Sequence, residues 1–478
     1  MAAPAKIVVG NSKNFPFLSA YRRRPSNAKG AKTRTIFEQA HSDRGRVIFS
    51  ASFRRLAQKT QVFALSLDGA RTRLTHSLEV AHIGAFIVDE IFRRLDKRKT
   101  GASVLADWKG LDWQERSAIR TFVEVACLVH DIGNPPFGHF GEKAICNWFR
   151  LKKESIGWFR DAIPANRNLE YDFTGFDGNK QGFRILTRLQ RNGDDEYGLN
   201  LTATQLAATI KYPVLNVEEP SKCSYFQSEN SIKREVWKAL IQNENDRHPL
   251  SLIMEAADDI AYCVSDLEDA AEKGLVTTND LKSAFGKTID FSHLSKGITK
   301  ARTDLTIDLV GRAAELFIAR IKNGTLNKPE SLLINDASLD RLREVTSKKV
   351  YSSRLVLSNE ITGYKILQGI LDAFIPLLEM EPDDFFKLAS AFEKRKSVYT
   401  PNLKKIIKNS TAEPSLLSLF PRKHLAVYIE AVSDKAEARL PERFHRLHLM
   451  VDFVAGMTDD FALSTYRLLS GQVTYEHR

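Results

Sequence analysis

The chain has 478 residues, 43% hydrophobic and 27% charged, a balance that can bury a substantial core and excludes disordered and fibrous classes. No stretch approaches the roughly 18 apolar residues of a membrane-spanning helix, and the apolar patch at residues 7–9 is too short for a secretory signal. The four scattered cysteines form no CxxC pair, so we expect neither a zinc finger nor a disulfide framework. A cytoplasmic location is therefore expected. The net charge of +11 favours a polyanionic partner such as a nucleotide or nucleic acid, although a basic protein without such a partner fits the composition equally well.

Helical periodicity dominates the chain. Residues 1–30 are rich in Pro, Ser, Asn and Arg and predict a partly ordered N-terminal arm. Apolar residues then recur at helical spacing from Val80 to Ile91 and from Ile119 to His130, and Pro249, a favoured first-turn residue, begins a third such helix. Further helices are expected at 302–322, 361–380, 383–396, 423–437 and 460–470, and a loop-like region at 158–197. Alternating strand patterns are scarce, so the sequence predicts an all-α fold.

The segment His130–Glu142 reads HDIGNPPFGHFGE and carries the most chemical information. A helix delivers His130 on its apolar side, Asp131 follows, and Gly133 with two prolines ends the helix. An imidazole and a carboxylate at a helix end can bind one divalent cation. A lone buried histidine would more often be structural, but four titratable groups within thirteen residues favour a site.

Two other segments offer further metal ligands. His76 lies on the same helix face as Val80 and therefore points inward. Downstream, Asp258, Tyr262 and Asp266 are four residues apart and share one helix face. A solvated acidic face is the alternative reading of that pattern, and the spacing alone does not choose between Asp258 and its neighbour.

Together these segments resemble the HD-domain phosphohydrolases, whose signature is a His, then a His-Asp pair, then a later Asp. They are most similar to the bacterial deoxyguanosinetriphosphate triphosphohydrolases (dGTPases). The motifs that carry this resemblance lie at residues 42–46, 53–56, 58–63, 71–77, 130–142, 255–266 and 453–459. The resemblance implies a single large helical HD-domain fold with additional C-terminal helices. It places the catalytic core at 31–275 and a helical C-terminal part at 276–478, packed on the core and completing the nucleotide site.

The resemblance also implies a metal centre and a catalytic pair. Four residues match the family's metal ligands: His76, His130, Asp131 and Asp258. Mixed imidazole and carboxylate ligation suits Mn²⁺ or Mg²⁺, with Fe²⁺, Co²⁺ and Zn²⁺ as alternatives. His139 and Glu142 match the catalytic pair, in which Glu142 orients His139 and His139 exchanges a proton with the water or the leaving 5′-oxygen. Attack at the α-phosphorus would release a deoxynucleoside and triphosphate.

Ten residues match the family's substrate contacts: Gln61, Val62, Arg73, Asn179, Lys211, Tyr212, Lys222, Tyr262, Asp266 and Glu360. The resemblance assigns the phosphates to Arg73, the Lys211-Tyr212 pair and Lys222, and Asn179 is the retained residue of a further family element. It places Gln61 and Val62 against the sugar and base. Asp177 stands beside Asn179 where the family usually has Glu.

The sugar and base contacts follow from the same resemblance. Tyr262 would exclude a 2′-hydroxyl, leaving Asp266 to accept from the 3′-hydroxyl. Glu360 aligns with a base-reading position, and a basic cluster near Arg395 is expected to supply its partner. The guanine preference is therefore less firmly based than the deoxyribose preference.

The leading hypothesis is a metal-dependent deoxynucleoside triphosphate (dNTP) triphosphohydrolase that prefers dGTP. One alternative is another HD-domain nucleotide phosphohydrolase, a 5′-nucleotidase or phosphodiesterase, and a second is a single-stranded nucleic-acid-binding protein with a vestigial metal site. The family implies a homo-oligomer, often a hexamer, and single-stranded DNA as an effector. The residues leave open the physiological metal, the stoichiometry and the strictness of base choice.

Overall fold

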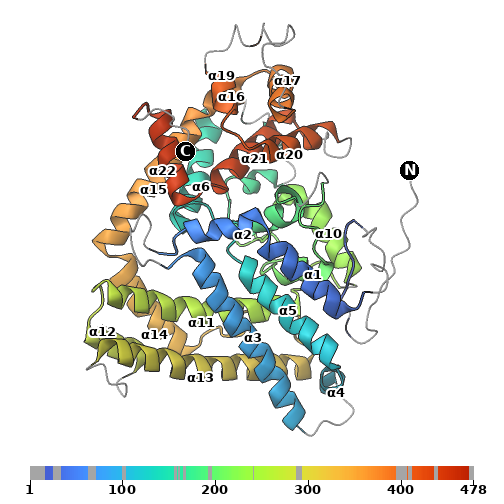
Figure 1. Ribbon diagram of the computed structural model, residues 1–478, viewed down its shortest axis with the longest axis vertical. Helices are drawn as coiled ribbons and strands as arrows, with labels where there is room; N and C mark the ends of the chain where they lie inside the picture. The colour runs from blue at the N-terminus through green and yellow to red at the C-terminus, as the bar shows by residue number, and fades with distance from the viewer. Residues whose placement is uncertain are drawn as a thin grey trace.

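The computed structural model describes residues 15, 17–24, 34–62, 71–98, 104–155, 159, 162–164, 168–191, 196–240, 242–286, 293–394, 406, 412–434 and 440–472. Within these residues the chain is helical throughout (Figure 1), and an isolated antiparallel bridge between Thr60 and Thr72 is the one β-type pairing. The all-α prediction is confirmed. Most of the expected arm, Phe63 and Arg395 lie outside the described residues.

Two hydrophobic cores organise the helices, one in the lower and one in the upper part of Figure 1. The first core is formed by α1 (Ile36–Ile48), α2 (Ala51–Arg55), α3 (Arg73–Lys97), α4 (Val104–Lys109), α5 (Trp113–Val129), α9 (Ala203–Ala208), α10 (Asn230–Ala239), α11 (Pro249–Glu272), α12 (Thr278–Phe285), α13 (Leu294–Asn323) and α14 (Ala337–Thr346). The second is formed mainly by α6 (Gly138–Ser155), α15 (Arg354–Ala373), α16 (Ile375–Glu379), α17 (Pro382–Glu393), α19 (Glu413–Leu417), α20 (Arg422–Ser433), α21 (Glu442–Ala455) and α22 (Asp459–Leu469).

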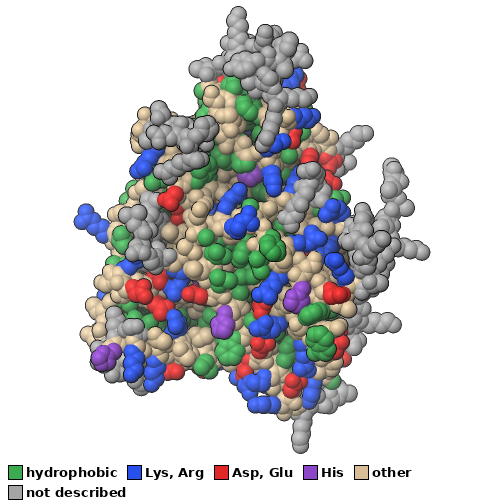
Figure 2. Space-filling view, in the orientation of Figure 1, with side chains coloured by type: hydrophobic (Ala, Val, Ile, Leu, Met, Phe, Trp, Pro, Cys, Tyr) green, Lys and Arg blue, Asp and Glu red, His purple; other side chains and the backbone are tan. Residues whose placement is uncertain are grey.

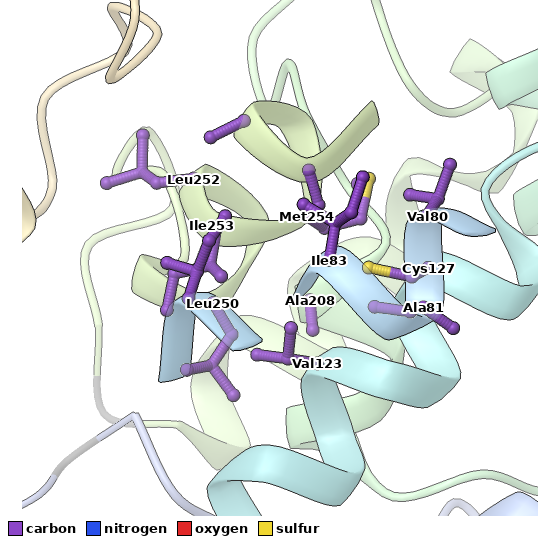
Figure 3. Packing of buried hydrophobic residues seen from close by; sticks show 14 of the residues in the cluster. Val80, Ala81, Ile83, Val123, Cys127, Ala208, Leu250, Leu252, Ile253 and Met254 are labelled. Atoms are coloured by element: carbon purple, nitrogen blue, oxygen red, sulfur yellow. The ribbon is translucent and has the colours of Figure 1, made fainter. Parts of the chain in front are cut away.

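The centre of the first core is the contact of α3, α5 and α11, whose apolar stripes face one another. Figure 3 shows side chains of α3, α5 and α11 meeting there. Gly84 allows α3 to approach α5 closely, because a Cβ at that position would lie 2.7 Å from Sγ of Cys127. Capping boxes at Thr72 and Asp112 fix where α3 and α5 begin. The packing and the caps together place the ends of these helices that carry polar side chains next to one another.

Within the second core, α6 packs closely against α15. Gly141 of α6 lies against Leu367 of α15, since a Cβ there would be 3.2 Å from Cδ1 of Leu367. Gly363 of α15 meets the ring of Phe137 in the same way, with Cγ at 2.5 Å from a built Cβ. These glycines let the two helices pack with little space between their backbones.

The segment Arg354–Glu379, which comprises α15 and α16, is long and apolar enough to cross a membrane, with a mean hydropathy of 1.2 over 18 residues. The sequence reading expected no such stretch. By length and composition alone this is a weak indication, since a core helix passes the same test. α15 packs against α6 and α22, which is how a core helix packs.

The region 158–197 differs from the loop that its composition predicts. It contains α8 (Gly178–Arg184), followed by a π-helical turn at Ile185–Leu189. Buried ion pairs hold it: Arg184 contacts Asp452 of α21 at 2.8 Å and Glu229 at 3.0 Å. Tertiary contacts of this kind outweigh the low helix propensity of Gly and Asn.

Candidate active site

A cavity of about 890 Å³ lies between the helix ends of the first core and the face of α6 and α15. Its wall includes most of the residues expected from the sequence: Gln61, Val62, Arg73, His76, His130, Asp131, His139, Glu142, Asn179, Lys211, Asp258, Tyr262 and Glu360. These residues come from segments as much as 299 positions apart in the chain, between Gln61 and Glu360. Polar side chains from distant segments that meet in one cavity are typical of an active site.

Four expected metal ligands meet at one side of the cavity. Ligand atoms of His76, His130 and Asp131 all lie within 4.8 Å of one another. Oδ1 of Asp258 is 3.3 Å from Nε2 of both histidines. Asp259 instead pairs with Arg343 at 2.9 Å, so the geometry favours Asp258 as the fourth ligand.

The hydrogen bonding of His130 suits it to bind a metal. Its Nδ1 donates to the carbonyl of Cys127 at 2.7 Å, and its buried Nε2 has no hydrogen-bond partner. A hydrogen bond of this kind fixes the tautomer and leaves the Nε2 lone pair for a cation. Burial alone would raise the pKa of Asp258, but Lys211 and His130 hold it well below its usual value. The donor set therefore fits a divalent cation.

Two basic side chains lie against the metal-ligand carboxylates. Nη1 of Arg73 is 2.6 Å from Asp131, and Nζ of Lys211 is 2.8 Å from Asp258. Gly138 admits the guanidinium, since a Cβ there would lie 2.7 Å from Nη2 of Arg73. Cations at these points can contact the oxygens of a phosphate bound at the same centre.

His139 and Glu142 form a hydrogen-bonded pair at the start of α6. Nδ1 of His139 is 2.8 Å from one oxygen of Glu142, and the other oxygen accepts the Gly178 N–H at 2.7 Å. The His139 side chain is 76% exposed, whereas Glu142 is 13% exposed. The hydrogen bond to Glu142 raises the pKa of His139 above its usual value. This arrangement suits proton transfer to a bound substrate.

The HD domain family matches residues 73–161, a span that contains three of the four metal-ligand candidates and the His139–Glu142 pair. Over 91% of its length the chain is 35% identical to the probable deoxyguanosinetriphosphate triphosphohydrolase of Pseudomonas aeruginosa, covering 93% of that protein. It is 34% identical over 94% of its length to the deoxyguanosinetriphosphate triphosphohydrolase of Enterobacter sp. (strain 638), covering 97% of that protein. The chain belongs to the deoxyguanosinetriphosphate triphosphohydrolase family. It is therefore an HD-domain hydrolase, and its His/Asp cluster could hold a metal ion.

In this hydrolase a tyrosine that the sequence reading missed joins the two residues expected at the sugar. The Tyr351 hydroxyl donates to the Asp266 carboxylate and is also hydrogen-bonded to the Tyr262 hydroxyl. Tyr262 and Tyr351 line the cavity, whereas Asp266 is reached through Tyr351. Burial raises the pKa of Asp266 to about 7, against the opposing effect of the Tyr351 hydrogen bond.

Two expected phosphate contacts of the hydrolase do not line the cavity. The Tyr212 hydroxyl is 3.4 Å from Glu255. Lys222 is exposed and pairs with Glu219 at 2.7 Å, although its neighbours Pro220 and Ser221 line the cavity. Their assignment to the phosphates stays a prediction.

Three further polar residues of α6 face the cavity and were not expected: Lys143, Asn147 and Arg150. Their spacing places them along one helix face that begins beside Glu142. That stripe was readable in the sequence as a continuation of the His130–Glu142 block.

A buried lysine anchors the turn that follows His130. Nζ of Lys59 donates to the carbonyls of Asn134 and, at 2.9 Å, Ala455. Asp459 accepts the Phe137 N–H at 3.1 Å and the Thr60 hydroxyl at 2.7 Å. We refer to Lys59 and Asp459 with these contacts as the Lys59–Asp459 latch. It gives a structural role to the 453–459 motif, for which the resemblance gave none.

Proposed function

We propose that this enzyme is a metal-dependent dNTP triphosphohydrolase that prefers dGTP and releases deoxyguanosine and triphosphate. The observation that carries the proposal is the juxtaposition of a His/Asp cluster, the basic side chains of Arg73 and Lys211, and a histidine–glutamate pair in one cavity. Two relatives named for this activity match the chain over more than nine tenths of its length.

The chain's own residues divide the reaction between them. A divalent cation held by His76, His130, Asp131 and Asp258 would lower the pKa of a water and neutralise charge on the α-phosphate. Arg73 and Lys211 bind phosphate oxygens. Because Glu142 engages Nδ1 of His139, the other ring nitrogen is available to give a proton to the 5′-oxygen as its bond to the α-phosphorus breaks.

The opposite side of the cavity is assigned to the deoxyribose. Packing of the Tyr262 ring against the sugar leaves no room for a 2′-hydroxyl, and Asp266 accepts from the 3′-hydroxyl. Tyr351, from the C-terminal part of the chain, holds both side chains by hydrogen bonds. In this proposal the C-terminal part of the chain completes the nucleotide site.

Product analysis tests the proposal. The protein is incubated with Mn²⁺ and each of the four deoxynucleotides, and the products are separated by ion chromatography. Intact triphosphate with an equimolar deoxynucleoside is expected, most rapidly from dGTP. Release of pyrophosphate or monophosphate in place of triphosphate would contradict it and favour a 5′-nucleotidase or phosphodiesterase.

A single-stranded DNA effector and a homo-oligomer remain part of the proposal. Figure 2 shows Lys and Arg side chains around an apolar patch near the middle of one face, a combination that suits stacked bases and phosphates. A mobility-shift titration with single-stranded DNA should give a salt-sensitive complex. Light scattering measures the mass of the protein in solution, and the mass of a monomer would contradict the proposed homo-oligomer.

A further inference from the structure

A second, smaller cavity of about 240 Å³ adjoins the Lys59–Asp459 latch. Helices α2, α20, α21 and α22, labelled in the middle and upper parts of Figure 1, contribute to its wall. Its lining residues are Arg55, Gln58, Pro421, His424, Phe453, Gly456, Met457, Thr458 and Phe461. None of them is acidic, and none lines the cavity of the candidate active site. The enzyme therefore has a further polar cavity that the proposed reaction does not use.

Three polar side chains of this wall make no hydrogen bond or ion pair with the described residues: Arg55, Gln58 and His424. His424 is 9% exposed, and its buried Nδ1 has no hydrogen-bond partner. Buried polar groups are nearly always hydrogen-bonded, so a buried imidazole without a partner indicates a ligand that it would contact. Arg55 and Gln58 add unbonded N–H groups at the same cavity.

The electrostatics of the cavity favour an anion. Burial lowers the pKa of Arg55, and the positive charge of Arg54 lowers it further. Burial also lowers the pKa of His424 to about 4, with Asp452 opposing and Arg55 contributing, so the imidazole is neutral at pH 7 and offers one N–H donor. Helix α20 begins at Pro421 without a side-chain cap, and the backbone N–H groups of such a helix end attract anions. A bound anion would compensate all three groups.

The rest of the wall is largely apolar and limits the size of the ligand. Phe453 and Phe461 meet edge to face, with ring centroids 6.4 Å apart at an angle of 76°. Phe461 is 49% exposed, so one aromatic ring is open to contact with a ligand. Sites for drug-sized ligands typically measure about 300–1,000 Å³. A cavity of about 240 Å³ therefore suits a phosphate group, alone or with one ring system attached.

The cavity lies between the two chain segments that the latch joins. Arg55 precedes Lys59 by four residues, and residues 456–458 lie between the latch contacts at Ala455 and Asp459. A ligand in the cavity would contact both segments at once. It would therefore hold them together next to the bonds of Lys59 and Asp459.

We propose that this cavity binds a phosphate group, supplied by inorganic phosphate or by a nucleoside monophosphate, and that the bound ligand strengthens the latch. Phosphate oxygens accept from the Arg55 guanidinium and the His424 imidazole on one side and from the Thr458 hydroxyl on the other. Because the latch anchors the turn that bears His139, the bound ligand raises kcat. The site goes beyond the proposed function, since the reaction does not require it.

Equilibrium binding tests the site. Inorganic phosphate and AMP are titrated calorimetrically into the metal-free protein, in which no cation draws phosphate to the candidate active site. The ribose 2′-hydroxyl of AMP also conflicts with the proposed packing of Tyr262. Arg55→Met should weaken binding at least about tenfold, the effect of losing one charge-assisted hydrogen bond. Tighter binding of AMP than of phosphate would identify a nucleotide as the ligand, and AMP binding that is equal, weaker or absent would identify the inorganic anion.

Arg54→Met is the matched control. Arg54 is the exposed neighbour of Arg55, donates to the carbonyl of Phe49 at 2.8 Å and does not line the cavity. Arg54→Met should bind both probes nearly as the wild type does. If the wild type binds neither probe, or if Arg55→Met loses no more affinity than Arg54→Met, the site is overturned.

Kinetics and linkage test the coupling to the latch. At saturating dGTP, phosphate should raise kcat in the wild type and leave it unchanged in Arg55→Met, whereas phosphate that competes at the candidate active site raises KM alone. Linked equilibria are reciprocal, so Lys59→Met should weaken phosphate binding about fivefold or more. An unchanged kcat in the wild type, or an unchanged phosphate affinity in Lys59→Met, would overturn the coupling. Phosphate binding that depends on Arg55 in a protein that releases no triphosphate would contradict the proposed function alone.

Discussion

Glu142 holds His139 with one carboxylate oxygen and the backbone of Gly178 with the other, at 2.8 and 2.7 Å. The carboxylate cannot rotate without losing one of these bonds, so the imidazole of His139 has a fixed partner although its side chain is largely exposed. The same hydrogen bond raises the pKa of His139. A histidine with a raised pKa keeps its proton at higher pH, as a general acid requires.

The pH dependence of kcat follows from that pair. As pH rises through the raised pKa of His139, the imidazole loses its proton and kcat should fall. Glu142→Gln removes the charge that raises the pKa, so the falling limb of the profile should move to lower pH as well as lower rates. Glu154→Gln, at an exposed position of the same helix, is the control. If the falling limb of the kcat–pH profile stays at the same pH in Glu142→Gln, His139 is not the group whose titration causes the fall.

Metal removal tests the ligand cluster. Chelation with EDTA should abolish activity and Mn²⁺ should restore it. His130→Gln should weaken Mn²⁺ binding at least about 100-fold, because it removes a direct ligand. Thermal unfolding provides a second readout: Mn²⁺ at 100 times its Kd should stabilise the wild type by about 2.7 kcal/mol and the variant hardly at all. His41→Gln, an exposed histidine of α1, should behave as the wild type, and equal stabilisation of His130→Gln would contradict the assignment.

The Tyr351 hydroxyl provides a test at the sugar. In Tyr351→Phe the hydrogen bond that lowers the pKa of Asp266 is lost, so this pKa should rise further above about 7. At neutral pH more of Asp266 is then protonated, its acceptor strength falls, and KM for dGTP should increase. The increase should shrink as pH rises and Asp266 ionises. Dideoxyguanosine triphosphate lacks the 3′-hydroxyl and serves as the control substrate, so an equal KM increase for it would refute the role.

Breaking the latch should affect catalysis more than binding. Lys59→Met leaves the buried carbonyls of Asn134 and Ala455 without a donor, and each orphaned group costs about 1–3 kcal/mol of stability. The turn between Asp131 and His139 is then less firmly held, so kcat should fall with little change in KM. Denaturant unfolding and steady-state kinetics measure both. Lys109→Met removes a similar bond, to the carbonyl of Arg98 at 3.0 Å, away from the cavity. Lys109→Met should retain kcat. If kcat falls no further in Lys59→Met than in Lys109→Met, the positioning role of Lys59 is contradicted.

Helices with a clear apolar stripe could be predicted from the sequence. The stripes of α3, α5 and α11 are three-to-four-residue patterns that depend only on local spacing. α8 could not be predicted, because Arg184 is held by partners at Asp452 and Glu229 that no local pattern reveals. Composition there favours a loop, and a buried ionic network decides otherwise.

Part of the candidate site could likewise be predicted from the sequence and part could not. Family motifs brought His76, His130, Asp131 and Asp258 together, and the structure places them in contact. Tyr351 lies in a stretch with no recognisable motif, and its role arises from bonds to side chains 85 and 89 positions away. The base partner expected near Arg395 lies outside the described residues, whereas Lys143, beside the most conspicuous motif of the chain, lines the cavity.

The latch also sets the order in which the enzyme is completed. Every proposed metal ligand has been synthesised once Asp258 is made, yet the second acceptor of Lys59 comes 396 residues after Lys59. A nascent chain therefore carries the whole ligand set long before the turn bearing His139 is anchored. Full hydrolytic activity should therefore appear only when synthesis has passed the 453–459 motif.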